Sequence, residues 1–403
     1  MTEVIFPEAG RRGSEGVFPG GGVGALEGVA AGRRLPFFLA AEEYLARRAV
    51  RSDEPVAGRE VEAGEPGLAE CLNEGGLFFL WQSGPTVIFG RNQDPAAELD
   101  VEWCRAHGVE YYRRKSGGGC VYSDRGNIMI SCIYPGSGVQ ENFAKFSEAV
   151  CGALRSLGLP AEVSGRNDIL IDGRKVSGSA FFALPSSSIV HSTMLYETDF
   201  ASMEAALRPS RLKLGAKGVR SVSSRVCSVR EFLPELPLES FAKALRRALS
   251  AGGGRLVLGP EDLARIEEIE MSYLDEAFIE GRFGGAPCGA GAVAGGEASG
   301  AAGVGAGAGS DAECREICRE AYVPGCGCVN VSLRVRGGKI FNVSLIGDFF
   351  AASEEVGETL SRLLAGRRPV REDVEAALEG VALEKIVRGL STRAFVDILL
   401  GNG

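Results

Sequence analysis

Periodic and alternating hydrophobic positions divide the N-terminal two-thirds of the chain into helices and strands. Residues 36–50, PFFLAAEEYLARRAV, begin with a proline that a first helical turn tolerates and then repeat apolar residues at helical spacing, which predicts an amphipathic helix. Short apolar runs bounded by turn residues predict strands, and longer periodic stretches predict further helices. The strands are expected at 77–81, 85–89, 109–113 and 127–134, and the helices near 142–157, 200–208, 239–250 and 260–270.

A second pattern follows in the last quarter of the chain. Apolar and polar residues alternate over 329–335 and again over 341–345, with Arg-Gly-Gly at 336–338 between them. Alternation on both sides of a glycine turn predicts a β-hairpin. Helices are expected after the hairpin, at 353–365 and 371–399.

Glycine-rich segments separate these parts. Of the 403 residues 57 are glycine, about twice the average share. Residues 284–309 contain 11 glycines and 9 alanines, and such a stretch has little surface to bury and loses much backbone entropy on ordering. We expect it to be a flexible insertion and residues 1–34 to be a flexible tail. The remainder predicts a large α+β domain over 35–247 and a smaller α+β domain over 255–403, which contains the insertion.

Charge and composition exclude several classes of protein. The net charge of −9 argues against nucleic-acid binding through phosphate neutralisation, although a local basic cleft for a small anion is compatible with it. Apolar runs stay shorter than a membrane span, and the N-terminus lacks the pattern of a secretory signal. Eleven cysteines without export features indicate thiols in a reducing compartment. We expect a cytoplasmic monomer that binds neither nucleic acid nor membrane.

Histidine and cysteine, the common metal ligands, give little support for a metal centre. With His107 and His191 as the only histidines, a multi-histidine site is excluded, and a serine–histidine triad would have to use one of these two positions. The clustered cysteines do not have the paired spacing of a zinc site, so free thiols or an opportunistic disulfide are favoured over zinc. The cluster comprises Cys288, Cys314, Cys318, Cys326 and Cys328.

The segment RRKSGGGCVYSDRGN, residues 113–127, is the first candidate for chemistry. Three consecutive glycines between two strands are costly in entropy, and close approach of the backbone to a ligand is the usual reason for them. The two arginines beside them supply fork-shaped donors for a carboxylate or phosphate. The alternative is a flexible hairpin tip with a solvated basic flank.

Two further segments carry candidate cations. In GRNDILIDGRKVSGSAFF, residues 165–182, a lysine at the start of a return strand is followed by small residues, so it can lie over a pocket floor and act on a phosphoryl or acyl oxygen. The segment 211–229 places four basic residues among small ones over 213–225, and this local positive potential suits a nucleotide or another anion. They are Lys213, Lys217, Arg220 and Arg225. A solvated lysine and a solvated basic face are the respective alternatives.

Four motifs in this order resemble those of the lipoate-protein ligases in the biotin/lipoate A/B protein ligase family. That family carries a lipoate-binding loop RRxSGGGxVxHDxGN, a lysine motif GRNDLxxDGRKxSGSA, an HGT-like strand and an adenylate loop KGVxSVxSRV. This chain has RRKSGGGCVYSDRGN at 113–127, GRNDILIDGRKVSGSA at 165–180, HSTMLY at 191–196 and AKGVRSVSSRV at 216–226. The resemblance covers about 35–235 and, less clearly, the C-terminal end. It implies an α+β fold in which a catalytic domain of mixed β-sheets with packed helices is followed by a small α+β accessory domain.

The resemblance also implies a two-step reaction. Lipoate attacks the α-phosphate of ATP in the presence of Mg²⁺ to give lipoyl-adenylate and pyrophosphate, and a lysine of an acceptor protein then displaces AMP. The implied acceptors are apo lipoyl domains of 2-oxoacid dehydrogenases and the glycine cleavage H protein. Such chemistry needs cations and backbone donors more than a nucleophile. A covalent enzyme intermediate is not expected, since no nucleophile–base pair is evident in the sequence.

Residue roles follow from the same resemblance. Lys175 is expected to stabilise both transition states, and Asp168 is the one candidate ligand for the Mg²⁺ that accompanies ATP. The expected lipoate and adenylate contacts are Arg114, Ser116, Gly117, Gly118, Gly119, Asp124, Asn127, Asn167, Asp168, Ser177, Gly178 and His191, and the expected nucleotide contacts are Lys217, Gly218 and Arg225.

Three departures from the family pattern keep alternatives open. Ser123 stands where the loop motif has histidine, Phe182 stands where an arginine often follows the lysine motif, and residues 271–283 lack the usual tryptophans. One alternative is an octanoyl or lipoyl transferase on the same fold, which works without ATP. The other is a relative that binds lipoate without turnover.

Overall fold

The computed structural model describes most of the chain and divides it into two units, Met1–Gly281 and Arg282–Gly403. The described residues are 1–7, 26, 29–48, 75–136, 138–164, 167–208, 225–250, 253–281, 314–352 and 355–401. The predicted Gly/Ala insertion at 284–309 lies outside them. Within them, no helix is both long and apolar enough to cross a membrane.

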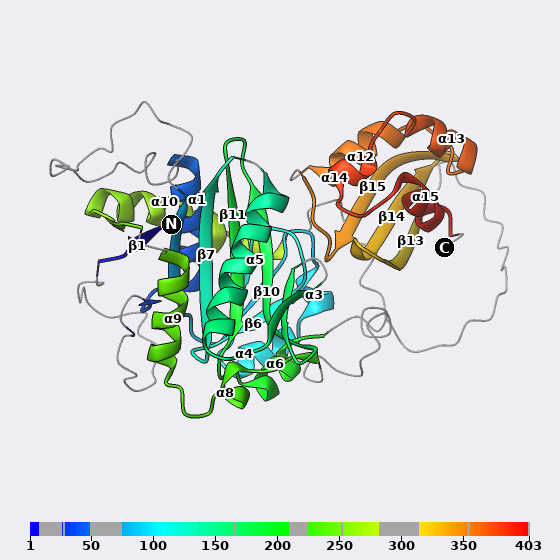
Figure 1. Ribbon diagram of the computed structural model, residues 1–403. Coiled ribbons are helices and arrows are strands. Elements are labelled where there is room, and N and C mark those ends of the chain that lie inside the picture. The colour runs from blue at the N-terminus through cyan, green and yellow to red at the C-terminus, as the bar shows by residue number, and fades with distance from the viewer. Residues whose placement is uncertain are drawn as a thin grey trace. The chain divides into compact units, whose positions relative to one another are not determined.

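A large mixed sheet forms the centre of the first unit (Figure 1). Its strands are, in spatial order, β12 (Arg255–Val257), β1 (Thr2–Ile5), β3 (Leu77–Trp81), β7 (Asn127–Pro135), β11 (Ser187–Leu195), β10 (Arg174–Ala183), β9 (Asp168–Ile171) and β8 (Ala161–Ser164), with β2 (Val29–Ala30) beside β3. A small second sheet has the order β5 (Glu110–Arg113), β4 (Thr86–Phe89) and β6 (Val121–Ser123). The helices of this unit are α1 (Leu35–Arg48), α3 (Pro95–Glu98), α4 (Val101–Ala106), α5 (Val139–Ser156), α6 (Phe200–Ala206), α8 (Val229–Phe232), α9 (Leu238–Ser250), α10 (Pro260–Leu274) and α11 (Glu276–Glu280).

Helices cover both faces of the large sheet, which explains its continuous apolar strands. In β3 the side chains of Phe78 and Leu80 join the core under α5 and α9, whereas Leu77, Phe79 and Trp81 join the core under α1 and α10. Successive side chains of a strand point to opposite faces, so a strand buried on both faces is apolar at every position. The run LFFLW therefore lacks the polar alternation of a half-exposed strand.

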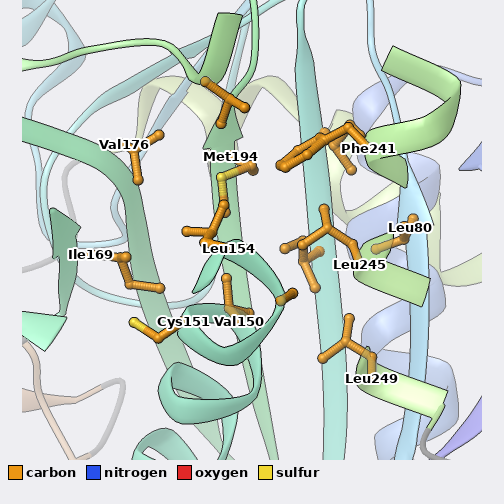
Figure 2. Close-up of a cluster of buried hydrophobic side chains, with 14 of the residues drawn as sticks. Leu80, Val150, Cys151, Leu154, Ile169, Val176, Met194, Phe241, Leu245 and Leu249 are labelled. Atoms are coloured by element: carbon orange, nitrogen blue, oxygen red, sulfur yellow. The ribbon is translucent and has the colours of Figure 1, made fainter. Parts of the chain in front are cut away.

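The core under α5 and α9 offers a direct test of packing in the first unit (Figure 2). Phe241 of α9 is fully buried there beside Leu245. Phe241→Ala is expected to lower the free energy of unfolding by about 3–5 kcal/mol, because the removed ring leaves a cavity that its neighbours fill only partly. Urea unfolding measures this loss. Val257→Ala, at an exposed position, is the control, and a loss as large as that of Phe241→Ala would contradict the assigned core.

The second unit is a three-stranded antiparallel sheet with helices packed on it. It comprises β13 (Cys314–Val323), β14 (Gly327–Arg336), β15 (Lys339–Gly347), α12 (Val356–Leu364), α13 (Arg371–Ala377), α14 (Leu383–Ile386) and α15 (Thr392–Leu400). The predicted hairpin is β14 and β15, while β13 was not predicted. The helices predicted over 371–399 are α13, α14 and α15, which are separated by short breaks. Gly380 and Gly389 lie between them with φ of +76° and +77°, a conformation that interrupts a right-handed helix.

The N-terminus and the domain boundary differ from the expected arrangement. Residues 2–5 of the predicted flexible tail form β1, which pairs in parallel with β3 and β12. Residues 255–281 of the predicted accessory domain belong to the first unit, where β12 extends the large sheet and α10 packs on α1. The local amino-acid pattern does not assign these segments to the first unit. Their partners, the strands of the large sheet and α1, lie far away in the sequence.

Candidate active site

The buried guanidinium of Arg114 shapes the glycine loop that joins β5 to β6. It donates to the carbonyl oxygens of Gly117 at 2.7 Å, Gly119 at 2.8 Å and Ile88 at 3.1 Å. Its Nε also donates to Ser116 Oγ at 3.0 Å. The sequence predicted that Arg114 offers its fork to a ligand. The contacts that the structure describes go to the chain itself, and ligand contact by Arg114 remains a prediction. Arg114 organises the loop.

The loop directs a backbone donor away from Arg114. A trans peptide places its C=O and N–H on opposite sides, so a Gly117 carbonyl that faces Arg114 turns the N–H of Gly118 the other way. Gly118 is buried with φ of +89°, and in the described part of the chain its N–H donates no hydrogen bond. A buried N–H without a partner is costly, and an oxygen of a bound ligand would satisfy it.

Gly90, directly after β4, has no side chain and so allows the glycine loop to lie close to the end of β4. A Cβ at this position would lie 2.2 Å from the Gly118 carbonyl oxygen and 3.3 Å from the Arg114 guanidinium. Gly90→Ala is therefore expected to push the glycine loop outward and to lower the free energy of unfolding by about 1–3 kcal/mol. Thermal unfolding together with ligand affinity checks this, and an unchanged melting temperature with unchanged affinity would contradict the close contact.

A buried chain of hydrogen bonds connects the loop to α1. Ser116 Oγ lies 2.8 Å from His191 Nε2, and His191 Nδ1 lies 2.8 Å from Glu42 Oε2. The other oxygen of Glu42 accepts from the hydroxyl of Ser131, which in turn accepts from Trp81 Nε1 at 2.9 Å. No nucleophile–base pair is evident in the sequence, yet the structure places a serine, a histidine and a carboxylate within hydrogen-bond reach in series.

Glu43, the next residue of α1, anchors Lys115, the loop residue directly before Ser116. Glu43 forms an ion pair with Lys115 at 2.7 Å and accepts from the Tyr273 hydroxyl of α10 at 2.8 Å. Burial alone would raise the pKa of Glu43, but its hydrogen bond and ion pair with Lys115 hold that pKa below its ordinary value. Two consecutive carboxylates of α1 thus hold two consecutive residues of the glycine loop.

Arg113 ties the same segment to the end of the first unit. Its fully buried guanidinium donates to the carbonyl oxygens of Phe278 at 2.8 Å and Gly281 at 2.7 Å. It also donates to those of Arg91 at 2.6 Å and Gln93 at 2.7 Å. Burial lowers the pKa of Arg113 to about 10, so the side chain stays positively charged at neutral pH. Arg113 has a structural role in these contacts.

The second centre is a cluster of three charges around β9 and β10. Lys175 Nζ lies 2.8 Å from Asp168 Oδ1, and Arg225 contacts the other oxygen of the same carboxylate. The backbone of Lys175 is also held, because Cys227 donates to its carbonyl at 2.9 Å. The cluster is only partly buried, with 19% of the Lys175 side chain exposed. The ammonium group is therefore positioned by an ion pair and remains accessible.

Gly178 gives the lysine its path over the sheet. A Cβ at Gly178 would lie 2.3 Å from Lys175 Nζ and 2.5 Å from its Cε, so the end of the lysine side chain occupies that space. A bulge between Lys175 and Ser177 shifts the register of the strand just before this point. This geometry agrees with the expectation that the lysine lies over a floor of small residues.

The sheet register brings the lysine and the glycine loop to one face. Gly178 and Ala180 of β10 share a face and are about 7 Å apart, and Ala180 pairs directly with His191 of β11. His191 is the residue that contacts Ser116 of the loop. The Lys175 ammonium and the glycine loop, which are 55 or more residues apart in the sequence, therefore adjoin on the α1 side of the large sheet.

Several other expected ligand contacts have internal partners. Asn167 donates to the Ser179 carbonyl at 2.6 Å, and Ser177 Oγ lies 2.6 Å from Ser192 Oγ. These two residues brace β9, β10 and β11 beneath the lysine. Ser123, at the position of the family's histidine, is fully buried.

Asp124 and Asn127 hold the turn between β6 and β7. Asp124 accepts from the backbone N–H groups of Gly126 at 2.8 Å and Asp199 at 2.9 Å, while Asn127 accepts from the Thr198 hydroxyl. Burial raises the pKa of Asp124. These contacts position the backbone of the turn. Ligand contact by Asp124 and Asn127 remains a prediction.

The expected nucleotide and metal ligands are only partly described. Lys217 and Gly218 lie outside the described residues, whereas Arg225 joins the Lys175 cluster. Both oxygens of Asp168 contact cationic side chains, and among the described residues no group of three His, Cys, Asp or Glu is arranged to hold a metal ion. Asp168 therefore does not fit a resident Mg²⁺ site.

The sequence predicted the loop, the lysine and His191, but it missed the residues that support them. Glu42, Glu43 and Ser131 carry no motif of their own, and Glu42 and Glu43 resemble the polar side of an amphipathic helix. In the structure α1 is buried from Leu35 to Ala46, so both carboxylates are interior groups. The available signal in the sequence was the pair Glu42 and Glu43 within an otherwise apolar helical stretch.

Comparisons with known proteins identify the family of the chain. The model for the lipoyl protein ligase A/B catalytic domain matches residues 37–250, and that for the bacterial lipoate protein ligase C-terminus matches residues 316–399. The lipoate-protein ligase LplJ of Bacillus subtilis is 30% identical over 325 residues, which is 80% of this chain and 90% of that protein. Lipoate–protein ligase 1 of Staphylococcus aureus is 36% identical over 178 residues, 44% of this chain and 54% of that protein.

Solved structures support the same fold. LipL1 of P. falciparum in complex with lipoate is similar over 93% of this chain and 97% of its own, with a TM-score of 0.64 and 16% identity. Lipoate-protein ligase A bound with ATP is similar over 63% of this chain and 97% of its own, with a TM-score of 0.51 and 22% identity. The predicted resemblance and the α+β fold are confirmed. The chain belongs to the lipoate-protein ligase family of enzymes.

Proposed function

We propose that the protein is an ATP-dependent lipoate-protein ligase that works through lipoyl-adenylate. A carboxylate oxygen of lipoate attacks the α-phosphorus of ATP, and the bond to the β-phosphate breaks to release pyrophosphate. The ε-amine of an acceptor lysine then attacks the acyl carbon, and AMP leaves. The proposed acceptors are lipoyl domains of 2-oxoacid dehydrogenases and the glycine cleavage H protein. The names of LplJ and of the ATP-bound ligase support this proposal.

The observation that carries the proposal is the position of Lys175 beside the glycine loop. Negative charge develops on the phosphate oxygens in the first step and on the acyl oxygen in the second. An ammonium group held over Gly178 by Asp168 can stabilise both charges without rearranging. The backbone N–H of Gly118, which donates no hydrogen bond in the described part of the chain, is the proposed second donor.

The remaining expected residues have supporting roles in this scheme. Asp168 and Arg225 set the position of the lysine, and Asn167 and Ser177 brace the strands below it. Lys217 and Gly218 remain proposed nucleotide contacts. Mg²⁺ would be bound by the phosphates of ATP, and the roles proposed for the residues of this chain require no metal site formed by the protein.

A lipoate-dependent assay of pyrophosphate release tests the proposal. ATP, Mg²⁺ and lipoate are expected to yield pyrophosphate, and adding an apo lipoyl domain or apo H protein is expected to yield the lipoylated acceptor and AMP. Release of no pyrophosphate, combined with octanoyl transfer from an acyl carrier protein, would replace the ligase by an ATP-independent transferase. Binding of lipoate with neither reaction would indicate a non-catalytic relative.

A further inference from the structure

The hydrogen bonds between α1 and the glycine loop have a defined direction. The Trp81 indole can only donate, and it donates to Ser131, whose own hydroxyl donates to Glu42. An ionised carboxylate can only accept, so His191 must donate from Nδ1 to the remaining oxygen of Glu42. In a neutral imidazole this leaves Nε2 bare, and it accepts from the Ser116 hydroxyl.

The same chain continues into the loop peptides. Arg114 Nε donates to Ser116 Oγ at 3.0 Å, and another nitrogen of the same planar guanidinium donates to the carbonyls of Gly117 and Gly119. Because the guanidinium is rigid, a shift of Ser116 would turn it and both carbonyls together. The direction of the Gly118 N–H depends on the Gly117 carbonyl across the same peptide plane.

We propose that Glu42 is a positioning residue that holds His191 in its Nδ1–H tautomer and thereby orients Ser116, Arg114 and the backbone donor of the glycine loop. Glu42 is 2% exposed, and such burial of a carboxylate is costly unless its oxygens accept hydrogen bonds. Both oxygens do. The identity of the substrate at the glycine loop rests on the proposed function, whereas the tautomer expected for His191 does not depend on it.

The arrangement has the order of a serine–histidine–carboxylate triad, but the surroundings of Ser116 favour positioning over nucleophilic attack. Ser116 is 2% exposed, and Arg114 donates to the oxygen that would have to attack. The Ser116 hydroxyl accepts from Arg114 and donates to His191, so it is held in place. A covalent acyl-serine is therefore not expected.

The small number of histidines makes the tautomer directly measurable. Protein labelled with ¹⁵N-histidine has two imidazole rings, His107 and His191, and His107→Gln assigns them. Wild-type His191 is expected to show the Nδ1–H pattern. Glu42→Gln keeps an oxygen that accepts from Nδ1 and is expected to retain it. Glu42→Ala removes the acceptor, and the ring is expected to change to the Nε2–H tautomer.

Kinetics connect the tautomer to the loop. Glu42→Ala is expected to lower kcat for lipoate-dependent pyrophosphate release by about 10²-fold through misplacement of the loop donor, with a smaller change in KM. Glu42→Gln is expected to recover most of this loss. Glu3→Ala is the matched control, since Glu3 is another buried carboxylate of the first unit, paired with Arg246 at 2.6 Å. It is expected to lower the melting temperature without lowering kcat.

Three results would overturn the inference: an unchanged His191 tautomer in Glu42→Ala, equal losses of kcat in the Gln and Ala variants, or a lipoyl adduct on Ser116 in the mass spectrum of the working enzyme. If the wild-type protein releases no pyrophosphate, the proposed function fails, and the ¹⁵N spectra still decide whether Glu42 sets the tautomer.

Discussion

Lys175→Ala is expected to lower kcat for adenylate formation by at least about 10²–10³-fold while the protein stays folded. This is the typical loss when one preorganised transition-state donor is removed. Lys175 is the ammonium group that the described structure holds over Gly178, on the same face as the glycine loop. The measurement is lipoate-dependent exchange of pyrophosphate into ATP, with circular dichroism to check the fold.

Two variants sharpen this experiment. Lys175→Arg keeps the charge but replaces a compact ammonium by a wider planar group, so it is expected to restore little activity. Lys145→Ala removes an exposed lysine of α5 that pairs with Glu141 at 2.8 Å, and it should leave kcat unchanged. Undiminished activity of Lys175→Ala would show that charge stabilisation lies on another residue.

Gly178→Ala is expected to remove nearly as much activity at little cost in stability. The added Cβ would occupy the space of Lys175 Nζ and Cε, at 2.3 and 2.5 Å, and the end of a flexible side chain moves away more easily than backbone does. A displaced ammonium no longer reaches the developing charge, and a misplacement of about 1 Å already costs about 10²-fold. Parallel measurements of kcat and melting temperature separate the two effects.

The same substitution elsewhere provides the control. Gly152 lies in α5, and a Cβ there would meet nothing within 4 Å. Gly152→Ala is expected to leave kcat unchanged and to stabilise the helix slightly, by about 0.5–1 kcal/mol. Full activity of Gly178→Ala would contradict the close approach of Lys175 to the strand.

The apolar pattern predicted most elements of the fold because their burial is a local property. The runs at 77–81 and 127–134 are strands with both faces buried, and the alternation over 329–335 is a strand with one packed face. Short segments were missed for a physical reason. β1 is a strand because β3 and β12 lie beside it, and neither neighbour is close in the sequence.

The site shows the same division between local and long-range information. Glycine at 117–119 and lysine at 175 suit the proposed chemistry by residue type, since close approach of the backbone and a positive charge both depend on residue type. The partners of those residues depend on the fold. Glu42 is 149 residues from His191 in the sequence and 2.8 Å from it in the structure. No spacing rule connects them, because the contact depends on how α1 packs against β11 in the folded structure.

The sequence by itself determined the family, the α+β class, the glycine loop and the lysine, because each is encoded in residue identity over a short stretch. The tertiary structure alone decided which polar groups of the candidate site have partners within the chain. Arg114 illustrates this: as a residue type it can bind an anion, yet its described contacts go to Ile88 and to the loop. Hydrogen-bonding capacity belongs to the side chain, whereas the partner that uses it is set by packing.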